Sequence, residues 1–133
     1  MLRRVRLRCL IVDDNESFLD VAASCLDGEE LEVLGTATTG EEALRQVAEQ
    51  NPDVVLVDIT LGKESGLEVA RVLVERFPQM ASGVVLISSR AETDFGGLIK
   101  ASPVAGFIPK TQLSARAVRE LVATRSPSDR EGT

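Results

Sequence analysis

The stretch Val54-Val55-Leu56-Val57-Asp58 consists of four apolar residues followed directly by a carboxylate. An apolar run of this length without alternating polar residues is typical of a strand that is buried on both faces of a sheet. Four further apolar runs occur at Leu7 to Val12, Leu31 to Leu34, Val84 to Ile87 and Ala105 to Ile108. The sequence therefore predicts five strands, and the 54–57 run is the third of them.

The segments between these runs change to the period of an amphipathic helix. The predicted buried faces consist of Phe18, Ala22, Cys25 and Leu26; Ala43, Leu44, Val47 and Ala48; Val69, Ala70, Leu73 and Phe77; and Leu113, Ala117 and Leu121 with Val118 and Val122. Thr39 and Glu42 form a capping-box pattern at the start of the second helix, and Asn51-Pro52 predicts its end. Gly96-Gly97 interrupts the segment 91–102, so we expect a short or partly unwound helix there.

Strands that alternate with helices predict an α/β fold, a doubly wound parallel sheet with helices on both faces. If the second strand lies at the edge, the strand order is 2-1-3-4-5. A chain of 133 residues that is 44% hydrophobic corresponds to one domain. We place this domain at residues 1–124 and interpret the polar segment 125–133 as a disordered tail or the start of a linker.

Charge and composition argue against several classes of partner. The net charge of -6 argues against nucleic-acid binding through this chain, because phosphate backbones attract clustered Lys and Arg. The apolar stretch Leu10 to Val12 is too short for a membrane span or a signal-peptide core, so we expect a cytoplasmic protein without a membrane partner. Cys9 and Cys25 lie in apolar segments and are expected to be free and buried. The chain has no histidine, so any phosphohistidine must belong to a partner.

Residues capable of chemistry follow four of the five predicted strands. Asp13 and Asp14 follow the first strand, Asp58 the third, Ser88 the fourth and Lys110 the fifth. In the order 2-1-3-4-5 these side chains converge at the carboxyl ends of the strands, where open parallel sheets bind their ligands.

Three carboxylates in one crevice need compensation. Each like-charge pair at ~4 Å costs about 4 kcal/mol at an effective dielectric near ~20. Protonation is one solution, and a hard divalent cation with oxygen ligands, such as Mg²⁺, is the other. A carboxylate can also attack a phosphoryl group, and a lysine and a hydroxyl then suffice to neutralise and position that group. The pattern therefore indicates metal-assisted phosphoryl chemistry.

Four motifs occur in order along the chain: Val12-Asp13-Asp14-Asn15-Glu16, Val57-Asp58 with Gly66, Leu86-Ile87-Ser88-Ser89, and Gly106-Phe107-Ile108-Pro109-Lys110. With them the chain resembles the response-regulator receiver domains, the CheY-like family of two-component signalling, from Leu7 to about Ala123. The Gly-Phe-Ile-Pro-Lys-Thr segment resembles the branch that often carries a C-terminal helix-turn-helix. The resemblance implies a regulatory domain rather than an enzyme, with at most phosphotransfer to itself and slow self-dephosphorylation.

The resemblance also implies roles for the residues of the predicted site. Asp58 would accept a phosphoryl group from a sensor histidine kinase or a phosphotransfer protein. Asp14 and Asp58 would bind Mg²⁺ directly, Asp13 would hold it through water, and the Thr60 backbone carbonyl would be a further ligand. Lys110 would pair with a phosphoryl oxygen.

Four residues would relay or time the signal if the resemblance holds. Ser88 would hydrogen-bond the phosphoryl group and leave room for Phe107 to turn, which would change the surface of the fourth helix, fifth strand and fifth helix. Thr60 and Arg90 would set the lifetime of the acyl phosphate. The expected output is a downstream protein or a C-terminal domain missing from this chain, and a phosphorylation-dependent homodimer is an option.

Two positions depart from the family pattern. Gly62 stands where proline is common, so we expect a less constrained backbone between residues 60 and 65. Thr111 follows the lysine where the family often has a cis proline. A cis bond before Thr111 would cost ~2.5–4 kcal/mol, so we expect a trans bond.

Three other functions would use parts of the same sequence pattern. A phosphatase of the aspartyl-phosphate type would need a second acid two residues after the nucleophile, where Thr60 stands. A P-loop around Gly62-Lys63 would need a glycine at Val57 and a hydroxyl at Glu64. The third is a receiver-shaped protein-interaction module that works without phosphorylation. This alternative stays open, although the sequence retains every acidic, hydroxyl and lysine residue of the site.

Overall fold

A computed structural model describes residues 6–89, 97 and 103–125 of the chain. Its centre is a five-stranded parallel sheet in the order β2-β1-β3-β6-β7. The strands are β1 (Leu7–Val12), β2 (Leu31–Ala37), β3 (Val54–Asp58), β6 (Val84–Ser88) and β7 (Gly106–Pro109). β6 and β7 are the fourth and fifth strands predicted from the sequence, so the predicted order 2-1-3-4-5 is confirmed.

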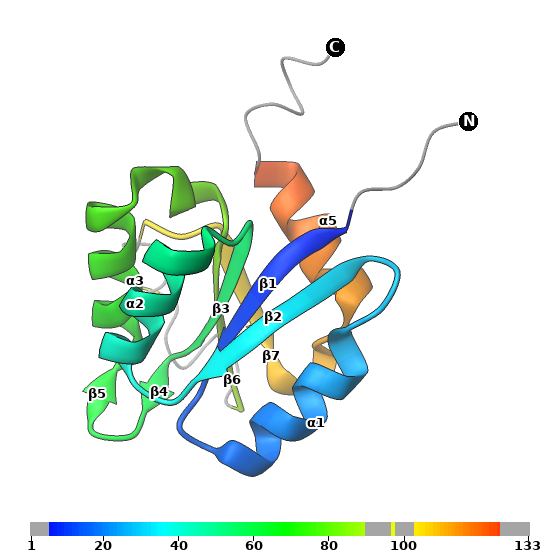
Figure 1. Ribbon diagram of the computed structural model, residues 1–133, viewed down its shortest axis with the longest axis horizontal. Coiled ribbons are helices and arrows are strands. Elements are labelled where there is room, and N and C mark those ends of the chain that lie inside the picture. Colours follow the sequence, from blue (N-terminus) through cyan, green and yellow to red (C-terminus); the bar gives the residue numbers. More distant parts are fainter. Residues whose placement is uncertain (1–5, 90–96, 98–102, 126–133) are drawn as a thin grey trace.

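Helices cover both faces of the sheet. The α-helices are α1 (Glu16–Leu26), α2 (Gly40–Gln50), α3 (Gly66–Arg76) and α5 (Ala115–Arg125), and the short 3-10 helices are η1 (Pro78–Ser82) and η3 (Lys110–Gln112). Figure 1 shows α2 and α3 on one side of the sheet and α1 and α5 on the other. The predicted doubly wound α/β fold is therefore confirmed.

Two hydrophobic cores result from this layering, one on each side of the sheet. Along β3, Val55 and Val57 belong to the core under α2 and α3, whereas Val54 and Leu56 belong to the core under α1 and α5. All five residues of β3 are buried, because the strand lies between β1 and β6 and is covered on both faces. This explains why an unbroken apolar run precedes Asp58.

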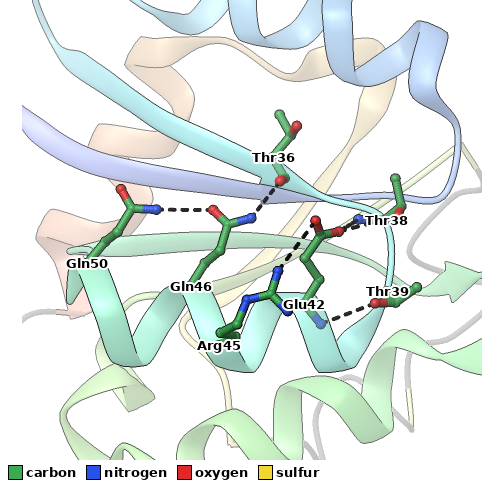
Figure 2. Close-up of polar contacts among 7 residues, drawn as sticks. All are labelled: Thr36, Thr38, Thr39, Glu42, Arg45, Gln46 and Gln50. Atoms are coloured by element: carbon green, nitrogen blue, oxygen red, sulfur yellow. Dashed lines mark hydrogen bonds and ion pairs between the residues drawn. The ribbon is translucent and has the colours of Figure 1, made fainter.

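Side chains of α2 hydrogen-bond the backbone at the outer edge of β2 (Figure 2). The Gln46 side-chain amide donates to the Thr36 carbonyl at 2.8 Å, and the Gln50 amide donates to the Gln46 oxygen at 3.1 Å. The Glu42 carboxylate accepts from the backbone N–H of Thr38 at 2.8 Å. The exposed edge of the sheet is thus partly satisfied from within the same chain.

The capping box predicted for α2 is formed only in one direction. The Thr39 hydroxyl accepts from the backbone N–H of Glu42 at 3.1 Å, as predicted. The Glu42 side chain reaches Thr38, one residue before the position that a capping box requires. At the other end, Asn51 adopts a left-handed conformation and ends the helix before Pro52.

Two details of the predicted helical faces are wrong. Cys25 is exposed and Leu19 takes its place beside Ala22 and Leu26, because the buried stripe of α1 is shifted around the helix. Ala48 of α2 is also exposed. The predicted buried residues of α3 are confirmed for Val69, Ala70 and Leu73.

Two predictions concern segments outside the described residues. They are the interrupted fourth helix at 91–102, of which only position 97 is described, and the tail after residue 125. In the described part, α5 extends to Arg125, one residue beyond the predicted boundary at 124. No helix within the described ranges combines the length and apolar character needed to cross a membrane.

Candidate functional site

The carboxyl ends of β1 and β3 bring three carboxylates together. Asp13, Asp14 and Asp58 each offer a carboxylate oxygen, and these oxygens all lie within 4.8 Å of one another. Asp13 and Asp58 are buried, whereas Asp14 is exposed. Three closely spaced carboxylates that open to solvent on one side form a set of oxygen ligands suited to a hard divalent cation.

Asp13 and Asp58 are held in the same way. In each carboxylate, Oδ1 accepts a hydrogen bond from the backbone N–H two residues further on, Asn15 in one case and Thr60 in the other, both at 2.9 Å. In each, Oδ2 faces the Lys110 ammonium, at 2.7 Å for Asp13 and 3.0 Å for Asp58. One lysine at the end of β7 therefore bridges the acids that follow β1 and end β3.

Burial and charge act on the proton affinities of this group. Burial raises the pKa of Asp58, the nearby Asp13 charge adds to the rise, and the Thr60 N–H and Lys110 oppose it only partly. Burial lowers the pKa of Lys110, but its hydrogen bonds with Asp13 and Asp58 outweigh that effect, so its pKa is raised. The lysine stays charged, and within the described site it forms ion pairs with two of the three carboxylates, Asp13 and Asp58.

A short antiparallel hairpin follows β3, made of β4 (Thr60–Leu61) and β5 (Glu64–Ser65). Gly62 has a φ of 60°, and it is the first residue of the two-residue turn, as in a type II′ turn. The expectation of a loosely constrained backbone at 60–65 is wrong, because Gly62 supplies a positive φ that closes a defined hairpin. A Cβ at Gly62 would lie 3.5 Å from Asp14 Oδ2, so the turn lies beside the acidic group.

The hairpin is fixed at its far end as well. The Glu64 carboxylate accepts from the backbone N–H of Gly40, at the start of α2, at 3.0 Å. Gly66 then passes so close to β3 that a Cβ would lie 1.8 Å from the Asp58 carbonyl oxygen. Its N–H donates to the Ile59 carbonyl at 2.7 Å. Only glycine fits where the chain returns against the strand that carries Asp58.

The remaining predicted residues occupy positions around this centre. Ser88 is buried at the end of β6, one residue beyond the partner of Asp58 in the sheet register. Phe107 of β7 is half-buried and packs against the core under α2 and α3. Thr60 is exposed, and Arg90 lies outside the described residues. None of the described peptide bonds is cis, in agreement with the trans bond expected before Thr111.

One contact of the site was not predicted from the sequence. The Lys110 ammonium lies over the ring of Phe18, 4.1 Å from its centroid. The helical period placed Phe18 on a buried face of α1, and nothing in the local sequence connects it with Lys110. Asn15, the N-cap of α1, belongs to the first motif, but the motif alone does not predict its two hydrogen bonds. Its backbone N–H donates to Asp13 and its side chain accepts from the Phe18 N–H.

Comparisons with known proteins agree with this geometry. The family model described as the response regulator receiver domain matches residues 9–122. The chain is 33% identical over 112 residues to a protein-glutamate methylesterase/protein-glutamine glutaminase from Pyrococcus horikoshii, which covers 82% of this chain and 30% of that protein. It is 30% identical over 118 residues to the transcriptional regulatory protein DegU from Brevibacillus brevis, which covers 88% of this chain and 49% of that protein.

A solved structure shares the fold. It is a response regulator protein from Burkholderia pseudomallei with a phosphorylated aspartic acid, a calcium ion and citrate. The TM-score is 0.69 and the identity 21%, over 95% of this chain and 70% of the other. The chain spans less than half the length of the two curated relatives. Its parallel sheet, its acidic site and the family match over residues 9–122 together lead to one conclusion: the chain belongs to the receiver domain family of two-component response regulators.

Proposed function

We propose that this receiver domain accepts a phosphoryl group on Asp58 from a phosphohistidine of a sensor histidine kinase or a phosphotransfer protein. The observation that carries the proposal is the Lys110 ammonium, held 2.7 Å from Asp13 and 3.0 Å from Asp58 at the open end of the sheet. An ammonium placed beside the attacking carboxylate can neutralise charge on an incoming phosphoryl group. The chain itself has no histidine, so the donor must be another molecule.

Mg²⁺ fits the donor set of this site. The oxygens of Asp13, Asp14 and Asp58 cluster within 4.8 Å, and no softer ligand belongs to the cluster. Asp14 and Asp58 would hold the ion directly, Asp13 through water, and the Thr60 carbonyl would complete the protein ligands. The bound ion would neutralise charge on the phosphoryl oxygens. The calcium ion and phosphorylated aspartate in the Burkholderia pseudomallei relative support this assignment.

The transfer step follows from the placement of the residues. A carboxylate oxygen of Asp58 forms a bond to phosphorus while the bond between phosphorus and the donor nitrogen breaks, and the donor keeps the electron pair. The Thr60 N–H at 2.9 Å from Oδ1 keeps the carboxylate oriented. The Lys110 ammonium then pairs with the negatively charged oxygens of the transferred phosphoryl group. The domain acts on itself, so we assign it a regulatory role rather than that of an enzyme.

The relay and timing roles belong to the same proposal. Ser88 ends the strand next to β3 and would donate to a phosphoryl oxygen. Phe107, half-buried at β7, would turn inward when Ser88 moves. Thr60 and Arg90 would set the rate at which the acyl phosphate hydrolyses.

The proposal also covers the boundaries of the domain, its output and its partners. We place the receiver domain at residues 1–125, one residue past the boundary predicted from the sequence because α5 ends at Arg125, and assign 126–133 to a tail or the start of a linker. Its output is a downstream protein or a further domain, and the different functions named for the relatives are consistent with either. The acidic balance supports a domain that does not bind nucleic acid. A cytoplasmic location, no membrane partner and, as an option, a homodimer that forms on phosphorylation complete the proposal.

The test is phosphorylation by a small donor. With Mg²⁺ and acetyl phosphate, the intact mass of the wild type should rise by one phosphoryl group, and Asp58→Asn should show no increase. Asp20→Asn, an exposed acid on α1, is the matched control and should be modified like the wild type. A folded wild type that stays unmodified would favour the interaction module that works without phosphorylation. Modification that persists in Asp58→Asn would instead assign the phosphoryl group to another residue.

A further inference from the structure

Phe18 contacts the one ammonium of the described site. Lys110 Nζ lies 4.1 Å from the centre of the Phe18 ring, well inside the ~6 Å range of cation–π attraction. The same ammonium forms ion pairs with Asp13 and Asp58, at 2.7 and 3.0 Å. The aromatic face supplies attraction without offering a competing hydrogen-bond acceptor.

Hydrogen bonds at the start of α1 fix the position of Phe18 relative to Asp13. The Asn15 side chain accepts from the Phe18 N–H at 3.1 Å and caps α1. The Asn15 N–H in turn donates to Asp13 Oδ1 at 2.9 Å. One turn of chain thus fixes both the acid and the ring that contact Lys110.

The ring has little freedom to move away. Phe18 is half-buried and packs against the core formed under α1 and α5. Lys110 is also largely shielded, with 17% of its side chain exposed. A long, flexible lysine side chain gains most from a fixed surface that limits its rotamers, because its ammonium otherwise samples many positions.

We propose that Phe18 is a positioning residue: its ring holds the Lys110 ammonium against Asp13 and Asp58, where it meets the phosphoryl group. The role of this ammonium in phosphoryl transfer rests on the function proposed above, whereas the contact between ring and ammonium does not. In this role Phe18 acts through Lys110, because the site contact of its ring is with that ammonium.

The matched variants are Phe18→Leu and Phe18→Tyr. Leucine fills much of the same space without an aromatic face, and tyrosine retains the ring. We expect Phe18→Leu to slow phosphorylation by acetyl phosphate about two- to thirtyfold, the range that corresponds to one cation–π contact. Phe18→Tyr should stay within about twofold of the wild type for the same reason.

Three readouts separate positioning from packing. In a Lys110→Ala background, Phe18→Leu should cause no further loss of rate, whereas a purely structural effect would appear in both backgrounds. The affinity for Mg²⁺ should change less than the rate, since the ring contacts Lys110, which is not one of the proposed ligands. Urea unfolding checks that both Phe18 variants are folded. If Phe18→Leu does not fold, Phe18→Tyr still tests the contact between the ring and the ammonium.

A final readout does not depend on phosphorylation. In NMR spectra, the Cε protons of Lys110 should show an upfield ring-current shift in the wild type and Phe18→Tyr, and lose it in Phe18→Leu. Unshifted protons in the wild type would overturn the contact itself. A phosphorylated wild type with equal rates in Phe18→Leu would overturn the positioning role but leave the proposed function intact. A wild type that shows the shift but is never phosphorylated would instead refute the proposed function and with it the role in transfer.

Discussion

The two cysteines differ in burial and therefore in their expected reactivity. Cys9 lies inside β1 with no exposed surface, and burial raises the pKa of its thiol to about 12. Cys25 is exposed on α1. Because the thiolate is the nucleophile, accessibility and pKa both favour reaction at Cys25 alone.

We therefore expect one thiol of the native protein to react with a colorimetric disulfide reagent at neutral pH, and two after unfolding in urea. Cys25→Ser should abolish the native reaction and leave one thiol detectable in the unfolded chain. Two fast-reacting thiols in the folded wild type would contradict the burial of Cys9.

The raised pKa of Asp58 makes folding depend on pH. Burial is the main cause, so the folded state keeps the Asp58 proton to a higher pH than the unfolded chain, whose pKa is about 3.9. The stabilising effect is complete below the unfolded pKa and is lost as the pH rises through the folded one.

In metal-free buffer, Asp58→Asn should consequently unfold at a higher urea concentration than the wild type at pH 7. The difference should shrink as the pH is lowered and should vanish below the unfolded pKa of about 3.9, where Asp58 is protonated in both states. Asp20→Asn, which changes an exposed acid, should show no such trend. A difference that is constant with pH would mean that Asp58 ionisation does not limit stability.

At the scale of the elements, the return of the chain from β3 to α3 depends on one missing side chain. A Cβ at Gly66 would overlap the Asp58 carbonyl, a backbone atom that cannot rotate away. The hairpin β4–β5 and the start of α3 would both have to move.

We expect Gly66→Ala to lower the free energy of unfolding by about 3 kcal/mol or more, at the upper end of overpacking effects. Gly28→Ala is the control, because a Cβ there meets no atom within 4 Å. Urea unfolding measures both variants. Equal stabilities for the two would show that the turn after β3 can widen at little cost.

The hydrogen bond between α2 and the edge of β2 gives a second prediction about stability. Gln46→Ala removes the hydrogen bond to the Thr36 carbonyl (Figure 2) and should cost about 1 kcal/mol of unfolding free energy. Glu49→Ala, an exposed position of the same helix, gives the same gain in helix propensity without that loss. The two variants should differ by the hydrogen bonds of Gln46, to the Thr36 carbonyl and from Gln50, and equal stabilities would assign them no net value.

The elements also show what the sequence could and could not predict. Long apolar runs reveal strands buried on both faces, so the sheet order and the meeting of Asp13, Asp14, Asp58 and Lys110 were predicted correctly. The hairpin at 60–65 was missed, because two-residue strands are too short to show a period. The contact of Phe18 with Lys110 was missed because it joins α1 to the far end of the chain, and only the fold brings the two together.

At the scale of the whole molecule, the two cores lie on opposite faces of the sheet, and the acidic group lies at the carboxyl ends of its strands. A cation that binds this group interacts with the folded state far more than with the unfolded chain. Binding is therefore linked to the stability of the entire domain.

Mg²⁺ should raise the thermal midpoint of unfolding, by an amount that corresponds to about 2.7 kcal/mol when its concentration is a hundred times the dissociation constant. The effect should be larger at pH 7 than at pH 5, because the ion binds deprotonated carboxylates and burial raises the pKa of Asp58. Sodium chloride at equal ionic strength is the control. A rise of equal size with sodium would indicate general screening and no specific site.

Lys110 also gives the resting domain a counter-ion that is part of its own chain. Such a tethered cation cannot be diluted, chelated or dialysed away, and its local concentration is fixed by the fold. A metal ion from solution must compete with this permanent neighbour for the same oxygens. The domain thus carries a cation beside Asp13 and Asp58 in metal-rich and in metal-poor surroundings alike.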